Sequence, residues 1–201
     1  EILELQALET CRAQVGGGPL REDLALSNAE ELNESVEDLE RWGLPILRDG
    51  ERVSSTRIRE AVRAADFLQA AGMLGRPYRW RGPVIHGRQL GRLLDYPTAN
   101  MKPGCGLQPP HGVYAVRARV NGAEYGGVAN LGVRPTVEGD AGELLLETHL
   151  FGQPGDIYGQ EMEVVPVRFL RAETKFPSLE ELKSQLARDA AQAAEVLRRD
   201  K

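Results

Sequence analysis

Residues 112–133, GVYAVRARVNGAEYGGVANLGV, decide the fold class of this chain. Apolar and polar residues alternate on both sides of Asn121-Gly122, a dipeptide that is typical of a two-residue β-hairpin turn. Similar short runs recur before and after this stretch, and turn residues separate them. They are YRWRGPVIHG (78–87), ELLLETHLFG (143–152) and EMEVVPVRFL (161–170). Five or six short strands at this spacing predict a small antiparallel barrel or sandwich.

Helical patterns flank the β-rich region on both sides. Residues 54–75 and 178–199 place apolar residues three and four positions apart, as a helix requires. Ser178, with Glu181 three residues later, forms a capping box that marks the start of the second helix. The expected buried stripe of that helix comprises Leu179, Leu182, Leu186, Ala190, Ala193 and Leu197.

Near Gly75 the predicted secondary structure changes from mainly helical to mainly β. We therefore predict two parts: a partial module over residues 1–75, and a β domain closed by one helix over residues 76–201.

Composition argues against several classes of function. The formal net charge is −5 with both signs interspersed, whereas a general nucleic-acid binder normally carries a basic surplus. No run of about 18 apolar residues is present, so we expect no membrane span. Two cysteines and three histidines show no metal-ligand spacing, which argues against a disulfide framework and a zinc site. We expect a cytoplasmic protein with no obligate protein partner.

The string YPTAN (96–100) is the most informative candidate site. Pro97 stiffens the backbone, and in an extended chain Thr98 and Asn100 point the same way. A hydroxyl and an amide oxygen are neutral ligands, suited to a hard cation that takes most of its negative charge from bound phosphates. The alternative is a polar turn before a strand, which composition alone favours.

Glu147 interrupts a leucine-rich strand. A carboxylate in such a run costs free energy unless it is partnered or functional. Period-two alternation places Glu147 and His149 on one face of the strand together with Leu145. The opposite face then carries Leu146, Thr148 and Leu150. A general base for a hydroxyl and a strand glutamate paired with an arginine are equally consistent with this pattern.

Two further segments give weaker signals. HGRQLGR (86–92) combines glycines, which let backbone N–H groups approach phosphate oxygens, with arginines that supply charge. It lacks the ending of a Walker A loop, and a surface hairpin would look the same. In FLRAETKFPSLEEL (169–182), Arg171 and Phe176 are candidates for the mouth of a pocket that takes a planar ligand. Phe176 could equally be a hydrophobic staple for the following helix.

Taken in order, these strings resemble the riboflavin kinase family over residues 76–201. The motifs are VIHG, the glycine/arginine loop, YPTAN, HGVYAV, NLGVRPT, LETHLFG, GDIYG and FLRAETKFPSLEEL. Upstream, VSSTRIREAV (53–62) is similar to the final motif of the FMN adenylyltransferase module in bacterial bifunctional riboflavin kinase/FAD synthetases. The resemblance implies a mainly β fold, a six-stranded antiparallel Greek-key barrel with a C-terminal helix. A partial, mostly helical α/β nucleotidyltransferase remnant would precede it.

The resemblance also implies a function and residue roles. It implies a riboflavin kinase, which transfers the γ-phosphate of Mg-ATP to the ribityl 5′-hydroxyl of riboflavin and gives FMN and ADP. Thr98 and Asn100 correspond to the Mg²⁺ ligands and Glu147 to the catalytic carboxylate. The ATP-side positions are Gly87, Gly91, Arg92 and Tyr158, and the flavin-side positions are Arg171, Thr174 and Phe176. A further signature of the family comprises Asn130, Arg134, Pro135 and Thr136.

The sequence also departs from the family pattern. Asp95 stands where the family usually has glycine, which adds a negative charge near the phosphates. The histidine pair of the adenylyltransferase module is absent, because the first histidine is His86. Two alternatives therefore remain: FMN adenylyltransferase (FAD synthetase) activity in a longer parent chain, and a non-catalytic flavin-binding module.

Overall fold

The computed structural model describes residues 47–48, 51–87, 96–104, 106–134 and 142–200. The chain divides into two compact units, Glu1–Trp42 and Gly43–Lys201, and every described residue belongs to the second. Of the partial module expected over residues 1–75, residues 1–46 and 49–50 lie outside the described residues. Among the helices that the structure describes, none is long and apolar enough to cross a membrane.

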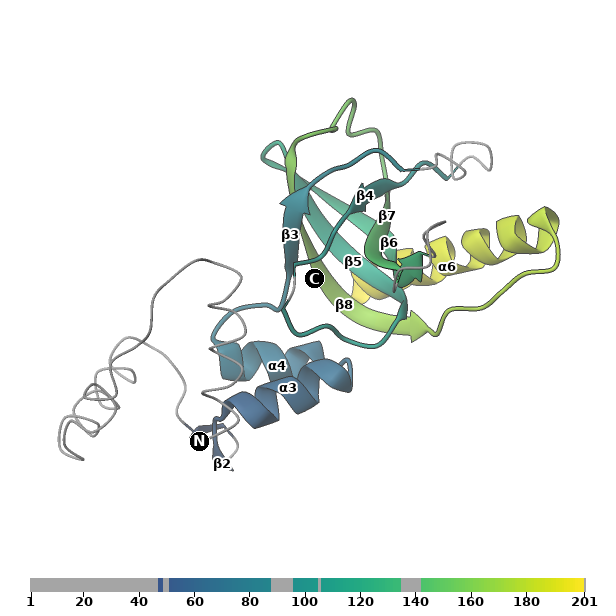
Figure 1. The fold of residues 1–201 in the computed structure, drawn as a ribbon. Coiled ribbons are helices and arrows are strands. Elements are labelled where there is room, and N and C mark those ends of the chain that lie inside the picture. Colours follow the sequence, from purple (N-terminus) through teal and green to yellow (C-terminus); the bar gives the residue numbers. More distant parts are fainter. Residues whose placement is uncertain (1–46, 49–50, 88–95, 105, 135–141, 201) are drawn as a thin grey trace. The chain divides into compact units, whose positions relative to one another are not determined.

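The second unit contains helices, a short strand pair and a larger sheet (Figure 1). The elements are β1 (Leu47–Arg48), β2 (Glu51–Arg52), α3 (Ser55–Arg63), α4 (Phe67–Leu74), β3 (Trp80–Pro83), β4 (Ala99–Met101), β5 (Gly112–Val120), β6 (Ala123–Arg134), β7 (Glu143–Leu150), β8 (Glu161–Arg171) and α6 (Leu179–Arg199).

The six larger-sheet strands form an almost closed antiparallel barrel in the order β3-β8-β5-β6-β7-β4. Strands β5, β6 and β7 follow one another, and β8 returns to lie beside β5, which is Greek-key order. The two edges meet where the Ile85 N–H donates to the Asn100 carbonyl at 2.7 Å. This contact covers edges that would otherwise expose unpaired backbone groups. The predicted six-stranded Greek-key barrel is confirmed.

The hairpin between β5 and β6 forms at the predicted turn. Asn121 has φ 51° and Gly122 has φ 75°, so both lie in the left-handed region that a type I′ turn requires. Val120 pairs with Ala123 directly across the turn. This turn fixes the register between β5 and β6.

Alternation along the strands separates two hydrophobic cores. The barrel interior is filled by large side chains, among them Tyr114, Val116, Leu131, Leu146, Met162 and Val164. On the opposite face of β5, Val113 and Ala115 pack against Ala193, Val196 and Leu197 of α6. The C-terminal helix thus covers the outer face of β5, β6 and β8, as Figure 1 shows.

The predicted stripe of α6 needs one correction. The capping residue is confirmed, because Ser178 Oγ accepts a hydrogen bond from the Glu181 N–H at 3.2 Å. Leu179, however, is 66% exposed. It is the first residue of the helix, well before Asp189, Ala193 and Val196, which are buried. Asp189 is buried instead, together with apolar residues of the C-terminal half.

The helical region predicted over residues 54–75 consists of two helices. The first ends at Arg63, and Ala65 adopts a φ of 55°. Asp66 then caps α4, accepting a hydrogen bond from the Gln69 N–H at 2.9 Å. This break lets Phe67 join the barrel core, where its ring lies 5.9 Å from that of Tyr114.

Candidate active site

Thr98 lies where two cavities meet. The first cavity, of about 520 Å³, is called the Tyr158 cavity here and has mainly apolar walls. Its lining includes Val84, Pro97, Thr98, Ala99, Leu150, Ile157 and Tyr158. The second, of about 280 Å³, is called the Phe176 cavity. Its lining includes Thr98, Asn130, Glu147, His149, Arg171, Thr174, Phe176, Leu182, Leu186 and Asp189.

The barrel register brings polar side chains of three neighbouring strands together. Asn100 of β4 and Asn130 of β6 both pair directly with Glu147 of β7. Directly opposed residues of antiparallel strands share one face of the sheet. The predicted alternation of β7 is confirmed, because Leu146, Thr148 and Leu150 are buried while Glu147 and His149 are partly exposed.

Asn100 is held tightly behind the turn that carries Thr98. It is 5% exposed, and its Nδ2 donates to the Thr98 carbonyl at 3.3 Å. The amide lies so close to Gly87 that a Cβ on Gly87 would be 2.4 Å from Asn100 Nδ2. Any side chain at position 87 would collide with this amide, so only glycine fits there. The structure describes no hydrogen bond to Asn100 Oδ1, and Asn100 is not among the lining residues of either cavity.

His149 ties the same turn to β7. Its Nδ1 lies 2.9 Å from the Pro97 carbonyl oxygen, so a proton on Nδ1 makes this a hydrogen bond. The Tyr96 ring packs against the imidazole, with 5.1 Å between the ring centroids. The YPTAN segment is thus fixed by β7 on one side and packs closely against Gly87 on the other.

Glu147 is paired with an arginine. Arg134, at the end of β6, donates from Nη2 to Glu147 Oε1. Both side chains are about one-third exposed, at 28% and 33%. The ion pair fixes the direction of the carboxylate and still leaves it on the wall of the Phe176 cavity.

The Tyr158 cavity has one aromatic wall. The Tyr158 ring stacks on that of His86, with centroids 3.8 Å apart and planes 24° from parallel. Thr148 also lines this cavity, and its Oγ1 is buried without a hydrogen-bond partner in the part of the chain that the structure describes. A flat, mainly apolar group is the kind of ligand that this lining favours.

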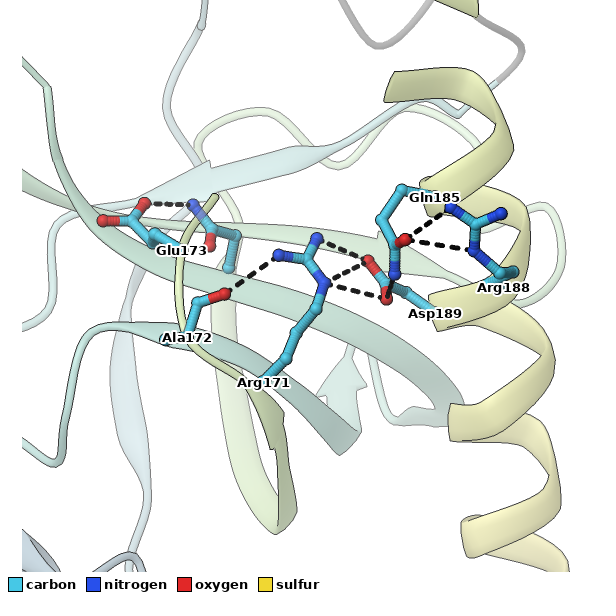
Figure 2. A network of polar contacts seen from close by, with 7 residues as sticks. Arg171, Ala172, Glu173, Gln185, Arg188 and Asp189 are labelled. Atoms are coloured by element: carbon cyan, nitrogen blue, oxygen red, sulfur yellow. Dashed lines mark hydrogen bonds and ion pairs between the residues drawn. The ribbon is translucent and has the colours of Figure 1, made fainter. Parts of the chain in front are cut away.

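The Phe176 cavity is bounded by the segment that joins β8 to α6. Arg171 places its guanidinium carbon 5.7 Å from the centre of the Phe176 ring, which is within the range of a cation–π contact. The same guanidinium is bonded to Asp189 of α6, as Figure 2 shows. Thr174 lies on the same segment and also lines the cavity.

Most of the predicted site residues come together. Thr98, Glu147, Arg171, Thr174 and Phe176 line one cavity, and Tyr158 lines the other. Gly91 and Arg92 belong to residues 88–95, outside the described residues. The sequence reasoning did not predict Asp189, although a carboxylate seven residues after Leu182 and three after Leu186 interrupts the apolar stripe.

The fold and the site together define a class of protein. It is a small Greek-key barrel with two cavities that meet at the hydroxyl-bearing residue Thr98. A family model described as "Flavokinase: Riboflavin kinase" matches residues 74–197. The chain therefore belongs to the riboflavin kinase family.

Known proteins are similar over most of the chain. The chain is 47% identical over 146 residues to the bifunctional riboflavin kinase/FMN adenylyltransferase of Haemophilus influenzae, covering 72% of this chain and 47% of that protein. It is 48% identical over 145 residues to the Pseudomonas fluorescens protein of the same description, covering 72% and 46%. The chain thus spans about half the length of these relatives.

A solved structure agrees with the fold. It is the crystal structure of a protein described as a macrolide-efflux protein from Streptococcus pneumoniae. The two match with a TM-score of 0.63 and 35% identity, over 72% of this chain and 47% of that one.

Proposed function

We propose that this chain is a riboflavin kinase, which transfers the γ-phosphate of ATP to the ribityl 5′-hydroxyl of riboflavin and forms FMN and ADP. Family membership supports this activity. The observation that carries it is the sharing of Thr98 by two cavities, with Glu147 on the wall of one. Two substrates bound in these cavities would meet at Thr98.

ATP would occupy the Tyr158 cavity. Val84, Leu150 and Ile157 offer apolar surface to the flat adenine, and Thr98 lies at the boundary with the second cavity. The triphosphate would then run toward Thr98, close to Gly87. In this proposal Gly87, Gly91 and Arg92 form the loop beside the phosphates.

Thr98 and Asn100 would hold Mg²⁺ together with the ATP phosphates. Their hydroxyl and amide oxygens are hard neutral donors, which suits a cation whose charge the phosphates offset. Asn100 Nδ2 donates to the Thr98 carbonyl, and no hydrogen bond to Asn100 Oδ1 is found among the described residues. When bound, the ion would offset negative charge on the transferring phosphoryl group.

Riboflavin would occupy the Phe176 cavity. The ring of Phe176 supplies an aromatic surface for the isoalloxazine, and Thr174 supplies a hydroxyl. In this orientation the ribityl chain would extend toward Glu147 and Thr98, which line the same cavity.

Glu147 would act as the general base. Its carboxylate takes the proton of the 5′-hydroxyl, whose oxygen attacks the γ-phosphorus. The bond between that phosphorus and the β,γ-bridging oxygen breaks, and ADP leaves with the bonding electrons. Arg134 holds the carboxylate in direction through the ion pair. Positioning and electrostatic stabilisation supply most of the acceleration in such transfers.

We further propose that residues 1–75 derive from an FMN adenylyltransferase module and that residues 76–201 form the kinase domain. The two relatives above are bifunctional by description and about twice as long as the matched region. FAD synthesis would then belong to a longer parent protein.

Product analysis tests the proposed activity. The purified chain is incubated with riboflavin, ATP and Mg²⁺, and FMN, FAD and ADP are separated by chromatography. We expect FMN and ADP in equal amounts and no FAD. Formation of FAD from FMN and ATP would indicate adenylyltransferase activity, and riboflavin binding without FMN would indicate a non-catalytic flavin-binding module.

A further inference from the structure

Asp189 is a buried carboxylate for which neither the family match nor the sequence suggests a role. It lies on α6, is 2% exposed and lines the Phe176 cavity. Arg171 Nε donates to its Oδ1 at 3.0 Å and to its Oδ2 at 3.1 Å, and Arg171 Nη2 donates to Oδ2 at 2.7 Å (Figure 2). A buried carboxylate is tolerated only with such close partners.

A second residue of α6 fixes the same carboxylate. Gln185 Nε2 donates to Asp189 Oδ1 at 2.7 Å. Gln185 Oε1 in turn accepts from Arg188 Nε at 3.0 Å and from Arg188 Nη2 at 2.6 Å. Asp189 is thus bonded both by Gln185 of its own helix and by Arg171 of β8, as the chain of contacts in Figure 2 shows.

Arg171 transmits this orientation to the segment of residues 172–177. Its Nη1 donates to the Ala172 carbonyl at 3.0 Å, and its guanidinium lies by the ring of Phe176. Two of the guanidinium nitrogens bond Asp189 and the third bonds Ala172. All three guanidinium nitrogens are therefore engaged within the protein, which suits a positioning role better than direct contact with the flavin.

The segment has a second attachment on the barrel side. Asn130 Nδ2 donates to Glu173 Oε1 at 3.0 Å. The Glu173 carboxylate also covers Gly132, where a Cβ would be 2.0 Å from Oε1. Residues 172–177 are thus fixed to β6 by Glu173 and to α6 through Arg171.

We infer that Asp189 is a positioning residue for riboflavin: through Arg171 it sets the wall that Thr174 and Phe176 present to the Phe176 cavity. This inference rests on the proposed function, because it assigns the cavity to the flavin. A purely structural role would be different, since it would only fasten α6 to the sheet.

The test replaces Asp189 by asparagine, which keeps the size of the side chain and removes its charge. We expect the KM for riboflavin to rise about 10- to 100-fold, the usual worth of a hydrogen bond to a charged group. The kcat and the KM for ATP should stay within about twofold of wild type, because Glu147 and the Tyr158 cavity are untouched. In an Arg171→Met background, Asp189→Asn should raise the KM for riboflavin by less than about a further twofold, because the contact between these two residues is already lost.

A matched control loosens the other end of α6. Arg117 of β5 donates from Nη2 to the Leu197 carbonyl at 3.3 Å and to the Asp200 carbonyl at 3.1 Å. Arg117→Met removes this attachment away from both cavities. It should lower the melting temperature and leave the KM for riboflavin unchanged.

A second readout needs no substrate. Trypsin can cut after Lys175, an exposed residue in the middle of the segment. We expect Asp189→Asn, but not Arg117→Met, to speed cleavage at this bond, measured by mass spectrometry of the fragments. If Asp189→Asn gives too little folded protein, Gln185→Ala removes one bond to the carboxylate and should change both readouts in the same direction.

The outcomes separate the two proposals. An unchanged KM for riboflavin in folded Asp189→Asn protein, with only a lower melting temperature, would reduce Asp189 to a helix anchor. If the wild-type chain makes no FMN, the proposed function fails. The cleavage rate at Lys175 then decides alone whether Asp189 holds the segment.

Discussion

Replacing Gly87 by alanine should displace the Asn100 amide from the candidate metal site. The added Cβ would lie 2.4 Å from Asn100 Nδ2, 2.7 Å from Cγ and 2.9 Å from Oδ1. Real Cβ atoms do not approach other heavy atoms this closely, so one of the two groups must move. Asn100 is 5% exposed and hydrogen-bonded to the Thr98 carbonyl, so its movement also disturbs the turn that carries Thr98.

The size of the effect follows from the cost of overpacking. An extra methylene in a tightly packed site costs about 1–3 kcal/mol. In the Gly87→Ala variant, the Asn100 amide can return to its wild-type position in the ATP complex only at this cost. The free energy of transition-state binding is then weaker by the same amount. At about 1.4 kcal/mol per factor of ten, kcat/KM for ATP falls roughly 5- to 150-fold. The KM for riboflavin should change little, because Asn100 does not line the Phe176 cavity.

The assay is initial-rate kinetics of FMN formation with ATP and riboflavin varied separately. Gly104→Ala is the matched control, because nothing lies within 4 Å of the Cβ added there. It should behave as wild type. Wild-type kcat/KM for ATP in Gly87→Ala would contradict this prediction and would mean that the position of the Asn100 amide is irrelevant to ATP use.

Two further predictions concern stability. Thr148→Val removes a buried hydroxyl that lacks a partner among the described residues. The free energy of unfolding, measured by denaturant titration, should therefore rise by about 1 kcal/mol. A fall in this free energy would show that the hydroxyl is paired. Burial raises the pKa of Tyr78 from 10.0 to about 12. The unfolded chain therefore loses this proton first, so the contribution of Tyr78 is complete below pH 10 and is lost as the pH rises toward 12. Thermal melts should show this loss, and Tyr78→Phe should make it smaller; an equal loss in that variant would assign it to other groups.

The barrel could be predicted because its signals are local. Strand alternation and the Asn121-Gly122 turn depend on residues adjacent in sequence, and the structure confirms both. The face of β7 that carries Glu147 followed from the same period of two.

The errors arose where tertiary contacts decide. Leu179 has the right helical spacing but lies at the start of α6, and the pattern cannot show where the sheet ends. The break at Ala65 lies within a sequence of good helix formers, and it becomes favourable because Phe67 then packs in the barrel core.

The site was only partly predictable for the same reason. Asp189 meets Arg171 only because α6 docks on the outer face of the barrel, and no sequence spacing encodes that contact. Arg134 and Glu147 are likewise joined by the pairing of β6 with β7. For Glu147 the sequence left two alternatives equally supported. The ion pair is present, and the catalytic role is compatible with it.

The most direct measurement compares single-turnover FMN formation by the wild-type chain and by Glu147→Gln, with both substrates bound at saturation. Glutamine keeps the shape of the side chain and cannot accept the proton of the 5′-hydroxyl. We predict a rate lower by about 10²- to 10⁴-fold, the usual worth of a positioned general base, with riboflavin and ATP still bound. A rate near that of the wild type would contradict the assignment of Glu147 as the base.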